Sequence, residues 1–155
     1  MKRIGAGLLF TALLIHAAMP FASAAEFSWK DASGTEFSLA DMQQPVALHF
    51  WATWCVPCRG ELPELAAWKK EHQDVKVVTI SLDRKTEMVN EFLSEEGVDL
   101  PVLLAKSSDS MRLGVRGLPS TVVLSADGDI KKLYTGPVPW NDEEFTREFL
   151  DLMQP

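Results

Sequence analysis

The sequence predicts an α/β sandwich built on a mixed β-sheet. Residues 46–51 and 75–82 are nearly continuous apolar runs, typical of strands covered on both faces, and each is followed by a segment with helical spacing. Later, two further apolar runs flank Asp127-Gly128, a strong β-hairpin signal. Parallel strands need crossover helices whereas hairpins are antiparallel, so we expect a sheet that begins parallel and ends antiparallel.

The first elements are a hairpin, a strand and a long helix. Residues 27–29 and 35–39 alternate apolar and polar side chains around a turn at residues 31–34, which predicts an N-terminal β-hairpin. The buried strand 46–51 then leads into a helix over residues 57–72, whose apolar residues fall on one side.

The second half continues this alternation. After the strand at 75–82, apolar residues recur with helical spacing from position 88 to 93, and Gly97 ends that helix. A short apolar run at 102–105 and a short helix at 109–113 follow.

The last elements are a hairpin and a helix. The hairpin pairs residues 121–124 with 130–134. Asn141, with Glu144 three residues later, resembles a capping box that opens the final helix. Phe145 and Phe149, with Leu152 and Met153, give that helix one apolar face.

Composition excludes several classes of function. The 155 residues fit one domain, and 46% hydrophobic with 24% charged residues is close to the globular average. Lys and Arg number 15 against 22 Asp and Glu, a net charge of −7, so we expect no nucleic-acid partner. Two cysteines are too few for a disulfide-rich scaffold or a four-cysteine zinc site.

The N-terminus has the three parts of a secretory signal peptide. Lys2 and Arg3 precede an uncharged apolar run at residues 4–15, and Ala22-Ser23-Ala24 supplies small residues at a cleavage spacing. We predict a signal peptide at 1–24, a domain at 25–155 and a periplasmic location, where disulfides persist. The alternative is an uncleaved membrane anchor, although the run is shorter than the ~20 residues that span a bilayer.

The sequence Cys55-Val56-Pro57-Cys58 lies where a strand gives way to a helix. Two sulfurs three residues apart on an opening helical turn can reach bonding distance. Cys55 falls at the helix N-terminus, where free N–H groups and the helix dipole favour a thiolate. Cys58 is one turn further in and should be more buried, which predicts an exposed attacking thiol and a shielded resolving thiol.

Other uses of two cysteines fit less well. A zinc site needs four ligands, and only His49 and His72 remain as imidazoles after removal of the signal peptide. We interpret His49 as a core or edge histidine and His72 as a solvated histidine at a helix end. Haem attachment needs His where Arg59 stands. The two cysteines could also form an inert structural disulfide. A disulfide that closes so short a loop constrains the unfolded chain little and therefore adds little stability.

The run at residues 50–63 resembles the active-site signature of the thioredoxin superfamily, and most closely the TlpA/ResA-like branch of exported thiol–disulfide oxidoreductases. The similarity continues at Gly117-Leu118-Pro119-Ser120-Thr121, at Asp127-Gly128 and at Thr135-Gly136. It implies a thioredoxin-like three-layer α/β/α sandwich with a mixed sheet and an added N-terminal β-hairpin. We also expect a monomer without a cofactor or metal.

The resemblance assigns roles to particular residues. Cys55 matches the family's nucleophile and Cys58 its resolving thiol. Pro119 matches a proline that follows a cis peptide bond and faces the cysteine pair, while the backbone at Leu118 pairs with substrate. An ordinary turn before a strand is the alternative interpretation of Leu118-Pro119. Further substrate contacts are implied at Trp54, Val56 and Pro57.

Glu61 has two interpretations. In ResA-like proteins a glutamate at this place lies near the thiols and influences their proton exchange, whereas a simple first-turn acid would complement the helix dipole. Trp54 likewise either packs beside the disulfide or serves as a hydrophobic anchor. Pro63 should kink the helix beyond the active site.

Related functions are distinguished by single positions. A peroxiredoxin would carry Thr and Pro where Ala52 and Leu48 stand, and a Sco-type copper chaperone would need three residues between its cysteines. The Val56-Pro57 spacer favours a reductase of exported protein disulfides, for example in cytochrome c maturation, kept reduced by a membrane thiol transporter of the DsbD/CcdA type. A disulfide oxidase or isomerase, and a non-enzymatic thiol- or metal-binding module, remain alternatives.

Overall fold

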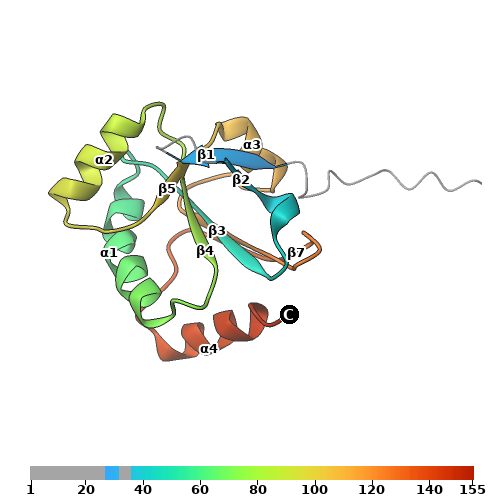
Figure 1. The fold of residues 1–155 in the computed structure, drawn as a ribbon. Helices are drawn as coiled ribbons and strands as arrows, with labels where there is room; N and C mark the ends of the chain where they lie inside the picture. Colours follow the sequence, from blue (N-terminus) through green and yellow to red (C-terminus); the bar gives the residue numbers. More distant parts are fainter. Residues whose placement is uncertain (1–26, 32–35) are drawn as a thin grey trace, which may run out of the picture.

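The structure, a computed structural model, describes residues 27–31 and 36–155. The predicted signal peptide at 1–24 and residues 32–34 of the predicted hairpin turn lie outside the described residues. Within the described part, seven strands form one sheet in the order β2-β1-β5-β4-β3-β6-β7 (Figure 1). The strands are β1 (Ser28–Asp31), β2 (Glu36–Ser38), β3 (Val46–Trp51), β4 (Val77–Ser81), β5 (Val102–Leu104), β6 (Ser120–Leu124) and β7 (Ile130–Thr135).

The sheet begins parallel and ends antiparallel, as predicted. β3 pairs in parallel with β4, and β4 with β5, whereas β6 is antiparallel to both β3 and β7. The predicted N-terminal hairpin is confirmed because β1 and β2 pair antiparallel, and β1 also joins the sheet edge at β5.

Layers of side chains cover both faces of the central strand β3, all of whose residues are buried. On one face, Ala47 and Trp51 join a core cluster with residues of α1 (Val56–Glu71), α2 (Thr86–Glu95) and α4 (Glu143–Leu152). On the other face, Leu48 and Phe50 pack with the N-terminal hairpin, the short η2 helix (Leu39–Asp41) and the segment after α3 (Ser107–Arg112). This confirms the three-layer arrangement.

α1 is the helix that carries the cysteine pair. It begins and ends within one residue of the predicted span 57–72, and Pro57 lies in its first turn, where a missing N–H costs no helical bond. Pro63 lies inside the helix, which runs on to Glu71. The kink expected at Pro63 stays a prediction.

The cap predicted for the last helix is wrong by one residue. α4 begins at Glu143 and its N-cap is Asp142, whose carboxylate accepts the backbone N–H of Phe145 at 2.8 Å. The side-chain amide of Asn141 instead donates from Nδ2 to Oε1 of Glu64 at 3.4 Å. The buried positions of Phe145 and Phe149 fix the start of the helix, and they bring Asp142 rather than Asn141 to the cap.

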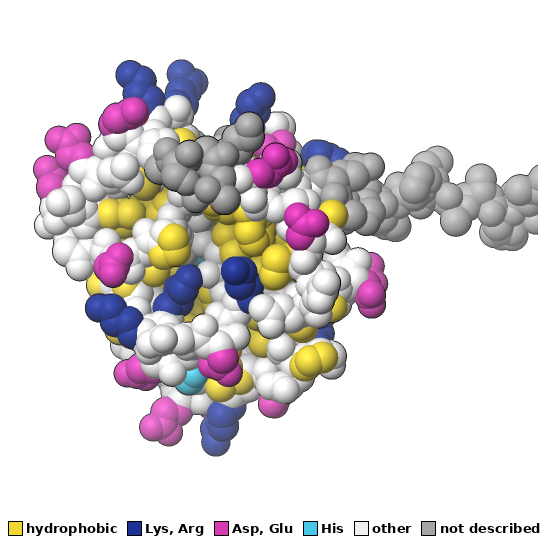
Figure 2. Space-filling view, in the orientation of Figure 1, with side chains coloured by type: hydrophobic (Ala, Val, Ile, Leu, Met, Phe, Trp, Pro, Cys, Tyr) yellow, Lys and Arg dark blue, Asp and Glu magenta, His cyan; other side chains and the backbone are white. Residues whose placement is uncertain are grey.

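The surface mixes charges of both signs. On the face shown in Figure 2, Lys and Arg side chains are interspersed with Asp and Glu, with hydrophobic side chains visible between them. Among the described helices, none combines the length and hydropathy that a bilayer crossing requires.

Candidate active site

The two cysteines form a disulfide at the start of α1. Cys55 is the N-cap residue with extended backbone angles, and Cys58 lies one turn into the helix, with 5.3 Å between their Cα atoms. Cys58 is fully buried, whereas Cys55 keeps 6% of its surface exposed. The direction of this difference is the predicted one, because Cys55, at the helix N-terminus, is the cysteine of the pair that keeps solvent-exposed surface.

The residues on either side of Cys55 are apolar and exposed. Trp54 is 66% exposed and Val56 is 76% exposed. A tryptophan anchored in the core would be buried, so the anchor interpretation of Trp54 is wrong. Large apolar side chains left in water around a reactive group are typical of a surface that binds a partner.

A groove of about 500 Å³ opens beside Cys55. It is lined mainly by apolar side chains, among them Trp54 and Pro57 next to the cysteines and Met111 and Leu118 from the segment after β5. Cys55 is therefore the only sulfur of the pair that reaches this groove.

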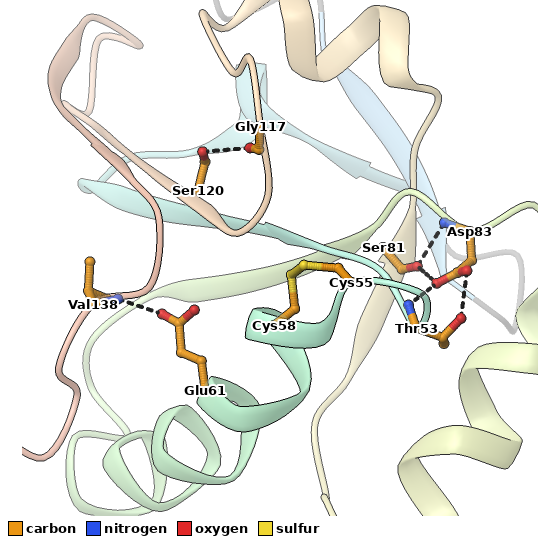
Figure 3. Close-up of a disulfide and its surroundings, with 9 residues drawn as sticks. All are labelled: Thr53, Cys55, Cys58, Glu61, Ser81, Asp83, Gly117, Ser120 and Val138. Atoms are coloured by element: carbon orange, nitrogen blue, oxygen red, sulfur yellow. Dashed lines mark hydrogen bonds between the residues drawn. A yellow bond between two sulfur atoms is a disulfide. The ribbon is translucent and has the colours of Figure 1, made fainter.

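The loop before β6 closes the groove with the predicted backbone geometry. The Leu118–Pro119 peptide bond is cis, Pro119 is buried, and the Ser120 hydroxyl donates to the carbonyl of Gly117 at 2.8 Å. Figure 3 shows this loop coming down toward the disulfide. The ordinary-turn interpretation of Leu118-Pro119 is thus wrong, while the roles of both residues in catalysis stay predictions.

Glu61 lies on α1 one turn after Cys58 and is 4% exposed. Its Oε1 accepts the backbone N–H of Val138 at 3.1 Å and the indole Nε1–H of Trp140 at 2.8 Å (Figure 3 shows the first). Burial raises the pKa of Glu61 to about 7, although these two hydrogen bonds oppose the rise, and the charge of Glu64 adds to it. A buried, bonded carboxyl group is not a solvated first-turn charge, so the helix-dipole interpretation is wrong.

A second carboxylate, Asp83, fixes the loop that precedes Cys55. Its oxygens accept the backbone N–H of Thr53 at 2.8 Å, the Thr53 hydroxyl at 2.8 Å and the Ser81 hydroxyl at 2.7 Å (Figure 3). This network was not predicted from the sequence. Thr53 and Asp83 follow the C-terminal ends of two adjacent parallel strands, β3 and β4. Such ends meet at one edge of the sheet, so this placement was the sequence signal from which the network could have been predicted.

The two histidines take no part in the cysteine site. His49 is buried, with Nδ1 3.0 Å from the Thr121 hydroxyl, and burial lowers its pKa to about 3. This confirms a neutral core histidine. His72 follows α1 and lies against the Trp68 ring. The residues that the structure describes contain no cluster of three or more His, Cys, Asp or Glu suited to a metal ion.

Comparison with known proteins agrees with this geometry. The AhpC/TSA family profile matches residues 21–133. The chain belongs to the AhpC/TSA family. ResA thiol–disulfide oxidoreductase of Halalkalibacterium halodurans is 28% identical over 136 residues, which cover 85% of this chain and 76% of the relative. The thioredoxin-like protein YneN of Bacillus subtilis is 32% identical over 78% of this chain and 74% of its own length.

Solved structures show the same thioredoxin-like fold. A crystal structure of a DsbE-like thiol:disulfide interchange protein from Chlorobium tepidum superposes with a TM-score of 0.71 at 27% identity, covering 84% of this chain and 95% of the other. Given this fold, the Cys55–Cys58 pair and these relatives, the AhpC/TSA member described here is a thiol–disulfide oxidoreductase of the ResA/DsbE type.

Proposed function

We propose that this oxidoreductase reduces disulfides of proteins outside the cytoplasm through the Cys55/Cys58 couple. The observation that carries the proposal is the asymmetric pair: Cys55 lines an apolar groove, while Cys58 is buried one helical turn before Glu61. Trp54, Val56, Pro57 and the Leu118 backbone would bind an extended segment around the substrate disulfide.

The reaction takes two exchanges. The Cys55 thiolate attacks one sulfur of the substrate disulfide, the substrate S–S bond breaks, and the departing substrate sulfur takes a proton. Cys58 then loses its proton and attacks Cys55, which breaks the mixed disulfide and releases the second substrate thiol. The substrate gains two electrons and two protons, and the enzyme ends in the disulfide form that the structure contains.

Glu61 is suited to the second exchange. Cys58 is shielded from water, so its proton needs an acceptor inside the protein. A carboxyl group with a pKa of about 7, one helical turn away, can accept that proton at neutral pH and return it later. We assign Glu61 as the general base and Pro119 as part of the wall that faces the pair.

The proposal includes the cellular setting. Cleavage after Ala24 would release a monomeric domain into the periplasm, and a membrane thiol transporter of the DsbD/CcdA type would reduce Cys55–Cys58 again. Cytochrome c maturation is one process that needs such a reductase.

A pair of single-cysteine variants tests the proposal. With a peptide disulfide as substrate, Cys58→Ser should form a stable mixed disulfide through Cys55, because no second thiol is present to resolve it. Cys55→Ser should form none at comparable rates, since Cys58 is buried. Mass spectrometry of the trapped adduct measures both. A mixed disulfide on Cys58 would contradict the assigned polarity, and no adduct with either variant would favour a non-enzymatic binding module.

A further inference from the structure

The segment between β7 and α4, residues 136–142, which we call the strap, holds the carboxyl group of Glu61. The strap contributes both donors to that carboxyl group, the Val138 backbone N–H and the Trp140 indole N–H, at 3.1 and 2.8 Å. Val138 and Trp140 are themselves buried. Figure 3 shows the strap backbone at Val138 directed at Glu61, on the side away from the Thr53–Asp83 network.

Both donors use the same oxygen. Oε1 accepts two N–H groups, whereas Oε2 is buried without a hydrogen-bond partner among the described residues. An oxygen that accepts two hydrogen bonds is a poor place for a proton, so a proton that binds Glu61 should bind Oε2. In Figure 3 this second oxygen is turned to the side on which Cys58 lies.

Trp140 is held rigidly enough to orient the carboxyl group. Its ring is almost fully buried and contacts Trp68, Phe145 and Phe149, with ring centroids 5.2, 5.4 and 5.2 Å away. Aromatic contacts on several sides leave the indole one orientation, and in that orientation Nε1–H meets Oε1.

We propose that Trp140 is a positioning residue of the active site, whose indole N–H occupies Oε1 and leaves Oε2 to exchange protons with the cysteine pair. The proposal deepens the function proposed above, since it rests on Glu61 serving the thiols. Removing the indole N–H should weaken the ionised form of Glu61, because a hydrogen bond to a carboxylate favours the charged state.

The titratable groups around this site come from several elements. Glu64 on α1 raises the pKa of Glu61. His49 on β3 faces the Trp140 ring at 6.1 Å, but burial keeps it neutral. The α4 residues that contact Trp140, Phe145 and Phe149, carry no charge. His72 packs against Trp68, with ring centroids 4.4 Å apart, and lines the surface cleft beside Trp140 together with Glu71, Asp142, Glu143 and Arg147. With the cysteines oxidised, the part of the Trp140 titration that Glu61→Gln removes is therefore that of Glu61.

The indole resonance of Trp140 in the oxidised full-length protein tests this without disturbing the fold. Nitrogen-15 NMR from pH 5 to 9 should show one inflection near pH 7 at Trp140 Nε1–H, and Glu61→Gln should abolish it. The Trp29 indole, which is buried in the core cluster on the other face of the sheet among Phe27, Phe37 and Phe50, is the control and should show no such inflection. A flat Trp140 resonance, or an inflection that persists in Glu61→Gln, would overturn the proposal.

A variant measures the size of the effect. Trp140→Phe should raise the pKa of Glu61, read from its carboxyl carbon resonance, by about one unit, a tenfold change equal to about 1.4 kcal/mol. Phe149→Leu disturbs the same aromatic cluster but keeps the indole N–H, so it should leave that pKa nearly unchanged. An equal shift in both variants would overturn the proposal. A third outcome is that the Trp140 resonance shifts with pH as expected while Glu61→Gln leaves thiol alkylation unchanged at every pH. In that case Trp140 still positions Glu61, and only the assigned role of Glu61 in thiol chemistry fails.

Discussion

Glu61 is a carboxyl group whose burial works against its charge. Its pKa rises from an ordinary value of 4.5 to about 7, so near neutral pH the folded protein binds a proton that the unfolded chain releases. Such a group contributes stability that is complete below pH 4.5 and is lost as the pH rises through 7. The feature that suits Glu61 to proton exchange therefore has a cost in stability at alkaline pH.

This linkage gives a prediction for the oxidised protein. From pH 4.5 to 8, ionisation of Glu61 should lower the free energy of unfolding by about 3 kcal/mol, an order-of-magnitude value from 1.4 kcal/mol per pKa unit. Glu61→Gln should lack this component, so its stability relative to wild type should increase with pH. Urea unfolding of both proteins at pH 5 and 8 measures the difference, with Glu87→Gln at an exposed position on α2 as control. Wild-type and Glu61→Gln curves that stay parallel would contradict the prediction.

Residue-scale prediction from sequence succeeded where the signal was local. The place of Cys55 at a helix N-terminus, the burial of Cys58 and the nearness of Glu61 to the pair follow from strand, helix and spacing. Trp140 and Asp83 were missed because their partners, Glu61 and Thr53, lie 79 and 30 positions away in the chain. Pairing at such separations depends on tertiary packing, which a single sequence does not display.

The start of α4 shows how local signals compete at the scale of an element. Asn141 and Asp142 are both good N-cap residues, and Glu144 gives Asn141 the capping-box spacing. The structure uses Asp142, because its carboxylate reaches the N–H of Phe145, a residue held in the aromatic cluster with Trp140. Tertiary packing thus decided between two equivalent local patterns.

The cap can be tested with two neighbouring substitutions. Asp142→Ala should lower the free energy of unfolding by about 1 kcal/mol, the usual cost of losing an N-cap side chain. Asn141→Ala should change it by less than about 0.5 kcal/mol, as at other exposed positions without a defined role. Urea unfolding of the oxidised proteins at pH 7 compares them. A larger loss for Asn141→Ala would show that the capping box starts one residue earlier in solution.

At the scale of the whole molecule, the order of strands was only partly predictable. The parallel β3–β4–β5 unit and the β6–β7 hairpin follow from crossover helices and turn residues. The attachment of β1 to the edge of β5 has no local signal; it places Trp29 in the core cluster with Phe50. The resemblance to the TlpA/ResA-like branch, which implied the added hairpin, supplied what periodicity could not.

The direction of electron flow is a property of this whole arrangement. Strong oxidants of this chemistry owe their potential to a stabilised thiolate in the reduced form. Here the Val56-Pro57 spacer adds no charge or donor, and the buried carboxyl group of Glu61 opposes a negative charge on the neighbouring thiols. The N-terminus of α1 favours the Cys55 thiolate, and Arg116 lines the same groove. The balance points to a reducing couple.

We therefore predict a reduction potential nearer the roughly −270 mV of thioredoxin than the roughly −120 mV of a strong oxidant. Equilibration with dithiothreitol or glutathione at pH 7, acid quenching and mass spectrometry of alkylated thiols measure it. Glu61→Gln removes the opposing charge, so it should make the potential less negative by about 10 to 30 mV, since 30 mV corresponds to about 1.4 kcal/mol of preferential stabilisation of the dithiol. A wild-type potential at the oxidising end would favour a disulfide oxidase on the same fold. A more negative potential in Glu61→Gln would mean that the carboxyl group stabilises the reduced cysteine pair rather than opposing it.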